Sequence, residues 1–235
     1  MTHPTGANAP SAEIVSLWKH QSKRDTSALS EVRSYWESLR SGRMVPLRSE
    51  VDPREISSAL EYGFVLERLS PGAVRFRLAG MHLSDLMGME VRGMPLRSFI
   101  APDDRARFSA MLDRVFTQPE IHEYILGSDN PSGGQIRARL LVLPLKSDSG
   151  EVNRAIGCLV SEGTVGLSLR RFHLKETRVT SLSNGEQTRE IAEQLPPAAA
   201  QEPRPQLAGF AELQERFNPE SRPALRLVVT DTPAD

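Results

Sequence analysis

The sequence predicts an α+β domain in which short helices and one long helix cover an antiparallel sheet of five strands. Apolar and polar side chains alternate with the two-residue period of strands in stretches that turn sequences separate. The period changes to 3.6 residues over residues 102–118, which indicates an amphipathic helix. With 39% hydrophobic and only 6% aromatic residues, the 235-residue chain is expected to form one core with tails outside it.

Two helical patterns precede the first strand. The apolar spacing of Ile14, Leu17 and Trp18 predicts a short helix that ends by Arg24. A second helix carries an apolar stripe at 3-4-3 spacing and ends before Gly42. The stripe consists of Leu29, Val32, Trp36 and Leu39. Such a stripe either packs on the domain or forms the seam of a two-helix dimer, and both interpretations stay open.

A brief helix and a hairpin come next. Residues 52–55, Asp-Pro-Arg-Glu, have the form of a capping box with proline at the first helical position. Residues 64–66 and 74–78 then show strand alternation on either side of the Ser-Pro-Gly turn at residues 70–72. Gly80 closes the hairpin, which supplies the first two strands of the sheet.

The middle of the chain is predicted to be helical. Short pieces at residues 81–87 and 96–99 are bounded by glycine and proline. The long helix begins at residues 101–104, Ala-Pro-Asp-Asp, since acidic residues stabilise a helix N-terminus, and Pro119 ends it. Its buried face consists of Phe108, Met111, Leu112, Val115 and Phe116.

Three further strands are expected at residues 121–126, 136–142 and 152–160, because apolar residues again alternate there. Turn sequences rich in glycine, serine and asparagine separate them. The domain with its N-terminal helix is thus predicted to span residues 28–168, after a polar segment with a short helix at residues 1–27.

Residues 169–235 are expected to form a Pro-rich, mostly disordered tail. Seven of the 17 prolines lie beyond residue 170, and that stretch has no tryptophan or tyrosine to build a second core. Two apolar islands at residues 207–213 and 225–229 are interpreted either as docking peptides or as collapsed remnants of the tail.

The order of these elements resembles that of the PAS fold. The amino-acid sequences of four stretches resemble a PAS-like family of unknown function that is common in alphaproteobacteria. The stretches are FVLERL at 64–69, FRLAG at 76–80, DDRAR at 103–107 and LLVLPL at 140–145. The resemblance implies a five-stranded antiparallel sheet with a helix-lined cleft, used for sensing, dimerisation and partner binding. Because fold alone does not establish function, these implications are expectations.

No catalytic residue, cofactor or metal site is assigned from the sequence. It contains none of the motifs GxSxG, HExxH, GxxxxGK[ST] or GxGxxG, and its one cysteine, Cys158, is expected to be a buried inert thiol. Flavin-binding relatives carry a reactive cysteine where this chain has residues 97–100, Arg-Ser-Phe-Ile. Haem-binding relatives use a histidine on or beside the long helix, which has none; His82 and His122 are the nearest.

The cleft implied by the resemblance would be lined by ten apolar residues from the hairpin and the helices. These ligand-cleft candidates are Phe76, Leu78, Leu83, Leu86, Met87, Phe99, Phe108, Met111, Leu112 and Phe116. Such a set is either plain core or a pocket for a small hydrophobic ligand, which the methionines among them would make adaptable.

Charge and arginine usage indicate a solvated sheet face or a protein contact rather than nucleic acid. The formal charge is -1, and no stacking aromatic residues are expected to interleave the strand arginines. Several strand arginines are expected to face away from the helical cover. With two residues of the N-terminal stripe, they are the candidates for an interaction surface: Trp36, Leu39, Arg68, Arg75, Arg77, Arg137 and Arg139.

The leading hypothesis is a stand-alone cytoplasmic PAS-domain regulatory protein, not an enzyme, that acts in signal transduction by contact with a partner or a second copy as a homodimer. A membrane role is not expected, since no apolar run reaches about 18 residues and residues 1–10 lack the basic and apolar regions of a signal peptide. One alternative is a sensor of a small hydrophobic ligand in the apolar cleft. Another is an isomerase-like enzyme with Asp85, His82 or Tyr124 in that cleft.

Overall fold

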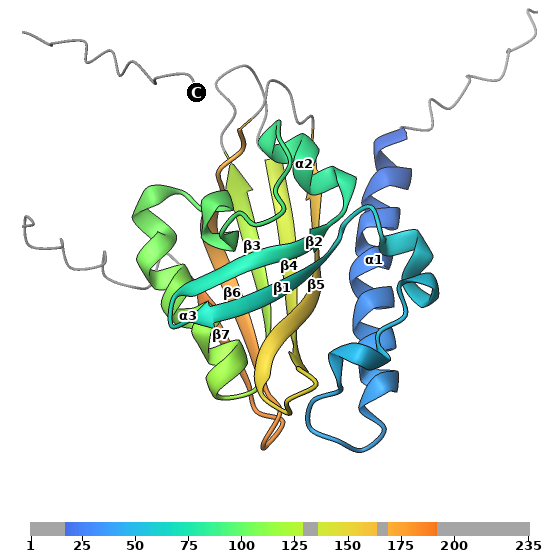
Figure 1. Cartoon of the computed structure of the whole chain (residues 1–235). Helices are drawn as coiled ribbons and strands as arrows, with labels where there is room; N and C mark the ends of the chain where they lie inside the picture. Colours follow the sequence, from blue (N-terminus) through green and yellow to red (C-terminus); the bar gives the residue numbers. More distant parts are fainter. Residues whose placement is uncertain (1–16, 129–135, 164–168, 192–235) are drawn as a thin grey trace, which may run out of the picture. The chain divides into compact units, whose positions relative to one another are not determined.

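The computed structural model describes residues 17–128, 136–163 and 169–191, and for residues 17–26 the backbone alone. Its main feature is one antiparallel sheet with the strand order β2-β1-β5-β4-β3-β6-β7 (Figure 1). The strands are β1 (Gly63–Ser70), β2 (Ala73–Ala79), β3 (Glu120–Ser128), β4 (Ile136–Lys146), β5 (Val152–Glu162), β6 (His173–Ser181) and β7 (Gln187–Ile191).

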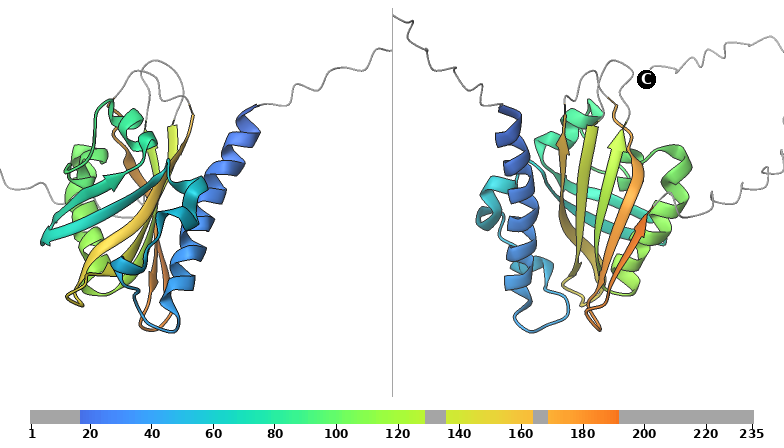
Figure 2. Two further views of the ribbon diagram at one scale, coloured as in Figure 1. Left: turned by 45° about the vertical axis from the view of Figure 1, so that its right-hand side comes forward. Right: turned by 180° about the vertical axis from the view of Figure 1, so that it is seen from behind.

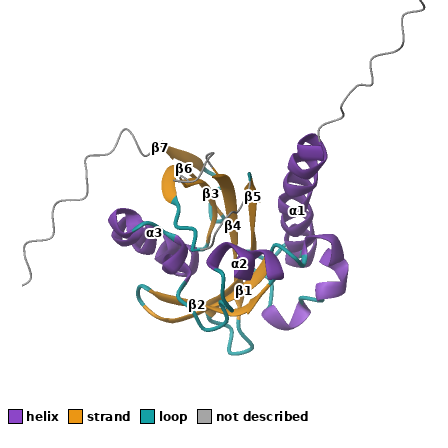
Figure 3. Ribbon diagram, turned by 90° about the horizontal axis from the view of Figure 1, so that it is seen from above, coloured by secondary structure: helices purple, strands orange, loops and turns teal. Residues whose placement is uncertain are grey.

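Helices lie against both faces of this sheet. The α-helices are α1 (Leu17–Arg40), α2 (Met81–Met87) and α3 (Arg105–Thr117). Four short 3-10 helices are η1 (Arg48–Glu50), η2 (Pro53–Ala59), η3 (Leu96–Phe99) and η4 (Pro102–Asp104). Seen from above, α2 and α3 lie on one side of the sheet and α1 on the other (Figure 3). We call the side with α2 and α3 the inner face and the side with α1 the outer face.

Each face has its own hydrophobic core. The inner core packs the buried stripe of α3, including Phe108 and Leu112, onto strand residues such as Leu66 and Leu140. The outer core packs Val32 and Trp36 of α1 onto residues such as Leu143 and Ile156. Because the central strands are buried on both faces, β4 and β5 carry nearly continuous apolar runs rather than a strict alternation.

The predicted α+β architecture with a large antiparallel sheet is confirmed, and two strands are added to the five expected. Strands β6 and β7 lie within residues that were expected to belong to a disordered tail, so that expectation is wrong for residues 173–191. In β6, a register shift between Ile125 and Leu126 of β3 breaks the alternation, and β7 has no fully buried residue. A rule based on apolar period therefore misses both strands. The apolar islands at residues 207–213 and 225–229 lie outside the described residues.

The N-terminal helices also differ from prediction. One continuous helix, α1, replaces the two that were expected, because no glycine or proline interrupts residues 17–40. It ends where Ser41 and Gly42 adopt left-handed backbone angles, with φ of 44° and 82°. Leu29, Val32 and Trp36 of its apolar stripe are buried in the outer core with residues of β4 and β5, so these three residues pack on the domain rather than forming a dimer seam. Figure 2 shows the helix itself on this side of the sheet in two views. Among the described helices, none has the length and hydropathy that a transmembrane helix requires.

Candidate functional site

Nine of the ten cleft candidates come together on the inner face. They belong to the inner core, where their side chains contact one another and are almost fully buried. The rings of Phe64, Phe76 and Phe99 form two successive edge-to-face contacts, with centroids 5.6 and 5.5 Å apart. These nine side chains thus form part of the inner core, on the face where the cleft was predicted.

Leu78 is the exception and corrects the sequence analysis. On the outer face, it is paired with Val65 and 49% exposed. The pairing jumps from Leu66 opposite Phe76 to Val65 opposite Leu78, which leaves Arg77 as the extra residue of a β-bulge. Because an extra residue reverses the alternation, Leu78 turns away from the inner core that Phe76 enters.

A chain of buried polar side chains connects α3 to β3. Glu120, His122 and Tyr124 occupy alternate positions of β3 and so project to the inner face. The Tyr124 hydroxyl lies 2.9 Å from His122 Nδ1, and His122 Nε2 lies 2.9 Å from Glu120 Oε2. Arg114 of α3 donates to Glu120 Oε1 at 2.7 Å. We call these four residues the polar chain.

The environment fixes the protonation of the polar chain. Burial lowers the pKa of His122, against the opposing effect of the Glu120 carboxylate. Burial alone would raise the pKa of Glu120, but hydrogen bonds from His122 and Arg114 outweigh it and hold that pKa below its ordinary value. Burial also raises the pKa of the Tyr124 hydroxyl. A neutral His122 therefore accepts from Tyr124 at Nδ1 and donates from Nε2 to an ionised Glu120, a tautomer assigned from the network.

The polar chain orders the interior of the domain and is not placed to act on a substrate. His122 and Tyr124 are both 0% exposed, and Tyr124 also packs on the ring of Phe108 with centroids 5.0 Å apart. Sequence reasoning noted His122 and Tyr124 separately and missed Glu120. Polar residues at positions i, i+2 and i+4 of a predicted strand were the available signal, since they share one face.

We expect the polar chain to make stability depend on pH below neutrality. Unfolded His122 titrates near 6.5, whereas folded His122 takes up its proton at lower pH, so the unfolded chain binds more protons in between. The stabilising effect is complete above pH 6.5 and falls by at most about 1.4 kcal/mol per pH unit below it. Replacing His122→Gln should flatten this slope when urea unfolding is followed between pH 7 and 5.

The control for this prediction is His173→Gln, which removes a half-exposed histidine that bonds to Asp104 at 3.0 Å. This variant should retain the slope attributed to His122. Because the slope rather than the stability itself is compared, a general weakening by the buried glutamine does not obscure the result. A slope unchanged in His122→Gln would contradict the protonation scheme.

The three residues of the enzyme alternative do not form one site. Asp85 is exposed on α2, and Tyr124 belongs to the buried polar chain. His82 Nε2 lies 3.1 Å from the Ser161 hydroxyl, and its ring meets Tyr62 edge-on. Burial lowers the pKa of His82, with Glu61 and Asp85 acting in the opposite direction. This arrangement is that of a half-buried structural histidine.

Cys158 is buried in the outer core beneath α1, as expected. Burial raises the pKa of its thiol to about 12, so almost no reactive thiolate forms near neutral pH. Within the described ranges, His, Cys, Asp and Glu side chains form no group of three that could hold a metal ion.

The interaction-surface candidates do not lie on one surface. Trp36 of α1 is fully buried against the sheet, and Leu39 of the same helix is half-buried. Arg68 lies on the inner face, where its Nε is 3.0 Å from Asp113 of α3, because it follows Phe64 and Leu66 in the alternation of β1. The prediction that the strand arginines face away from the helical cover is therefore wrong for Arg68.

The other arginines are distributed over separate parts of the sheet. Arg75 and Arg77 both approach Glu67 on the outer face, at 3.0 and 3.6 Å. Arg139 pairs with Glu123 across β4 and β3, and Arg137 is exposed near the start of β4. Arg75 and Arg77 thus share one carboxylate, and Arg139 is paired with another on a different pair of strands.

A polar groove of about 450 Å³ lies beside α1 over β3, β6 and β7. Its charged lining residues are Arg33, Glu123, Arg178 and Arg189. Arg178 and Arg189 each contact Glu176 at 2.6 Å, so this carboxylate offsets part of the positive charge. Sequence reasoning could not find the groove, since Arg178 and Arg189 lie in strands that were expected to be tail.

Comparison with known proteins gives one family match. A family model described as PAS domain matches residues 12–160. No curated protein matches the chain.

Several solved structures are similar to part of the chain. A light-oxygen-voltage domain studied with a flavin analogue is 16% identical over 47% of this chain and 83% of its own, with a TM-score of 0.37. The Rhodobacter sphaeroides LOV protein is 12% identical over 63% and 70%, with a TM-score of 0.35. A sensory box histidine kinase/response regulator from Burkholderia thailandensis E264 is 23% identical over 46% and 82%, with a TM-score of 0.32.

Proposed function

The chain belongs to the PAS domain family, and we propose that it regulates by protein contact through the outer face of its sheet, with α1 controlling access to that face. A general role in sensing or signal transduction follows from the family. The proposal adds a mechanism in which α1 leaves the sheet and a second copy of the chain takes its place.

The observation that carries this proposal is the apolar surface beneath α1. Leu141 and Leu143 of β4, with Ile156 and Val160 of β5, are buried in the outer core. Without α1, these side chains would join in one apolar surface on the central strands. An exposed surface of that kind on a folded protein is typical of an interaction site.

The inner face gives a reason why α1 can leave without unfolding the domain. The inner core holds β1 to β6 together through α2 and α3 and contains none of the side chains of α1 that the structure describes, residues 27–40. A helix held by a separate core can exchange between docked and released states while the remainder stays folded.

We expect the substitution Val32→Asp to increase self-association. Val32 is 0% exposed in the outer core, and a carboxylate there would be buried without a partner, so α1 should be released. The uncovered apolar face should then pair with a second copy. Size-exclusion chromatography with light scattering over a range of concentrations should show a mass increase toward the dimer.

The matched control is Ser34→Asp, which places the same charge at an exposed position of α1. That variant should keep the mass of the unmodified chain. Circular dichroism must show the sheet signal intact in Val32→Asp. If this folded variant keeps the mass of Ser34→Asp at every concentration, pairing through the uncovered face is wrong.

A further inference from the structure

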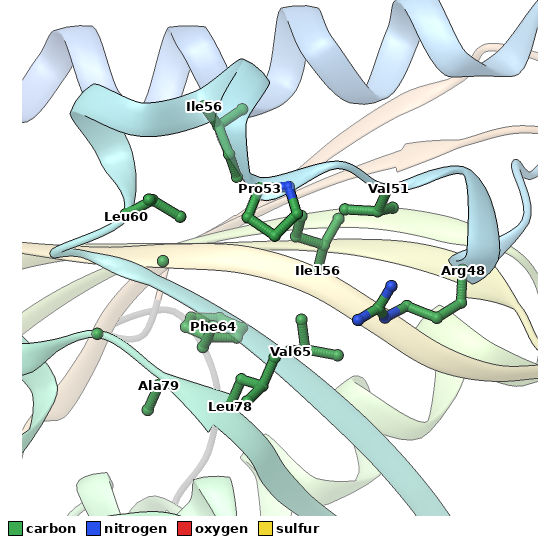
Figure 4. A pocket seen from close by; sticks show the side chains of 12 residues that line it. Arg48, Val51, Pro53, Ile56, Leu60, Phe64, Val65, Leu78, Ala79 and Ile156 are labelled. Carbon is green, nitrogen blue, oxygen red and sulfur yellow. The ribbon is translucent and has the colours of Figure 1, made fainter.

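The outer face also contains a pocket of about 160 Å³, which shares only Ile156 with the four residues named for the proposed contact (Figure 4). The segment from η1 to η2 forms one wall, with Val51 and Ile56 pointing toward the sheet. Val65 of β1 and Ile156 of β5 form the opposite wall, and Leu78 of β2 lies at its edge. The pocket is therefore on the side of the sheet opposite the helix-lined cleft.

The β-bulge at Arg77 builds this pocket. Val65 pairs with Leu78 on one side and with Ile156 on the other, so the three side chains form one apolar row across β2, β1 and β5. Leu78 is 49% exposed and Leu60, at the rim, 44% exposed. Two leucines so exposed around an apolar hollow leave surface that an apolar ligand would remove from water.

The pocket lining carries one positive charge. Arg48 is the one charged side chain in the lining, and no hydrogen bond or ion pair to another described residue engages its guanidinium. In Figure 4 this group lies beside Val65. The next outward-facing residue of β1 is Glu67, and this single carboxylate is shared by three arginines. These are Arg75, Arg77 and Arg154.

We propose that this pocket binds an amphiphilic carboxylate with a chain of about six carbons. The guanidinium of Arg48 would donate two parallel hydrogen bonds to the carboxylate, the geometry for which arginine is suited. The chain would lie along Val65, Leu78 and Ile156. An apolar cavity of about 150 Å³ accommodates benzene, which has six carbons. Because this pocket has a similar volume, we expect a ligand of about six carbons.

This inference goes beyond the proposed function, because it assigns a ligand to a separate site. The two are physically connected, since Val51, Ile56 and Ile156 line the pocket and also belong to the outer core that holds α1. A ligand bound in the pocket would therefore contact residues of η2 and β5 that also pack against α1.

The test is a titration of the full chain, labelled at isoleucine, leucine and valine methyl groups, with hexanoate. Saturable shifts are expected at the methyl groups of Ile56, Val65, Leu78 and Ile156. Hexan-1-ol should bind about tenfold more weakly or worse, because it cannot form the charge-assisted hydrogen bonds. Arg48→Gln should weaken hexanoate binding by the same factor, whereas Arg97→Gln, at an exposed arginine near η3, should leave it unchanged.

Three results would overturn the proposal: no saturable shift, shifts confined to inner-core methyl groups such as those of Leu83 and Leu112, or equal affinity for hexanoate and hexan-1-ol. Arg48 is half-buried and outside both cores, so its replacement should not prevent folding. The titration reads methyl shifts and not molecular mass. Its failure is therefore distinguishable from failure of the self-association proposed above.

Discussion

Replacing Gly157→Ala is expected to destabilise the protein by about 3 kcal/mol or more, or to prevent folding. A Cβ atom at this position of β5 would lie 1.9 Å from the Leu141 carbonyl oxygen and 2.7 Å from Cζ of Phe64. The first neighbour is backbone of the central strand β4 and cannot yield without separating the strands. The second is the ring that begins the aromatic series of the inner core.

The control is Gly127→Ala, in the neighbouring part of the same sheet. There a Cβ atom would approach only the side chain of Lys175, with Cε at 3.0 Å, and this flexible chain can turn away. Its free energy of unfolding should change by about 0.5 kcal/mol or less. Urea denaturation followed by circular dichroism measures both variants, and comparable losses would show that backbone crowding at Gly157 is not the cause.

The sequence was sufficient for elements whose apolar period is regular. Five apolar residues of α3 repeat at helical spacing, and all are buried in the inner core: Phe108, Met111, Leu112, Val115 and Phe116. The capping pattern that begins at Asp52 also predicts the brief helix η2, where the Asp52 side chain accepts from the Arg54 amide. In these segments, local pattern and tertiary packing favour the same structure.

The predictions failed where a single extra residue or an edge position changes the pattern. The bulge at Arg77 moves Leu78 to the outer face, and no composition or spacing in the hairpin indicates which residue is extra. Strand β7 lies at the edge of the sheet and buries little, so its apolar signal is weak. The outer pocket depends on both the bulge and the path of η1 and η2, which is why it could not be found from the sequence.

For the candidate site, too, the sequence predicted some features and could not predict others. The spacing of the inner-core residues indicated that they lie together, but not whether they enclose a cavity, since that depends on how side-chain volumes fill the space. The polar chain is defined by which of Glu120, His122 and Tyr124 share a face and by Arg114 reaching them from another element. Contacts between elements distant in sequence require the fold.

The substitution Trp36→Ala should have the largest effect on the outer core, a loss of about 3–5 kcal/mol in the stability of the docked α1. Trp36 is 0% exposed, and its indole Nε1 donates to the Pro144 carbonyl at 2.8 Å. Alanine would remove this bond and leave a cavity between α1 and β4. The guanidinium of Arg40, 5.3 Å from the ring centroid, would also lose its contact.

Two further variants separate packing from hydrogen bonding. Trp36→Phe keeps an aromatic ring but leaves the Pro144 carbonyl without its donor, which should cost about 1–3 kcal/mol. Ser34→Ala, on the exposed side of α1, should change the stability by about 0.5 kcal/mol or less. Urea unfolding followed by circular dichroism at 222 nm reports the loss of α1 together with the remainder of the domain.

The number of unfolding transitions in Trp36→Ala tests the proposed release of α1. If α1 is held by the outer core alone, its release should precede unfolding of the sheet, so one transition becomes two. The inner core contains no described side chain of α1 and should keep its own midpoint. A single transition shifted as a whole would mean that α1 and the sheet unfold as one unit, and a helix so coupled could not leave the outer face to admit a second copy.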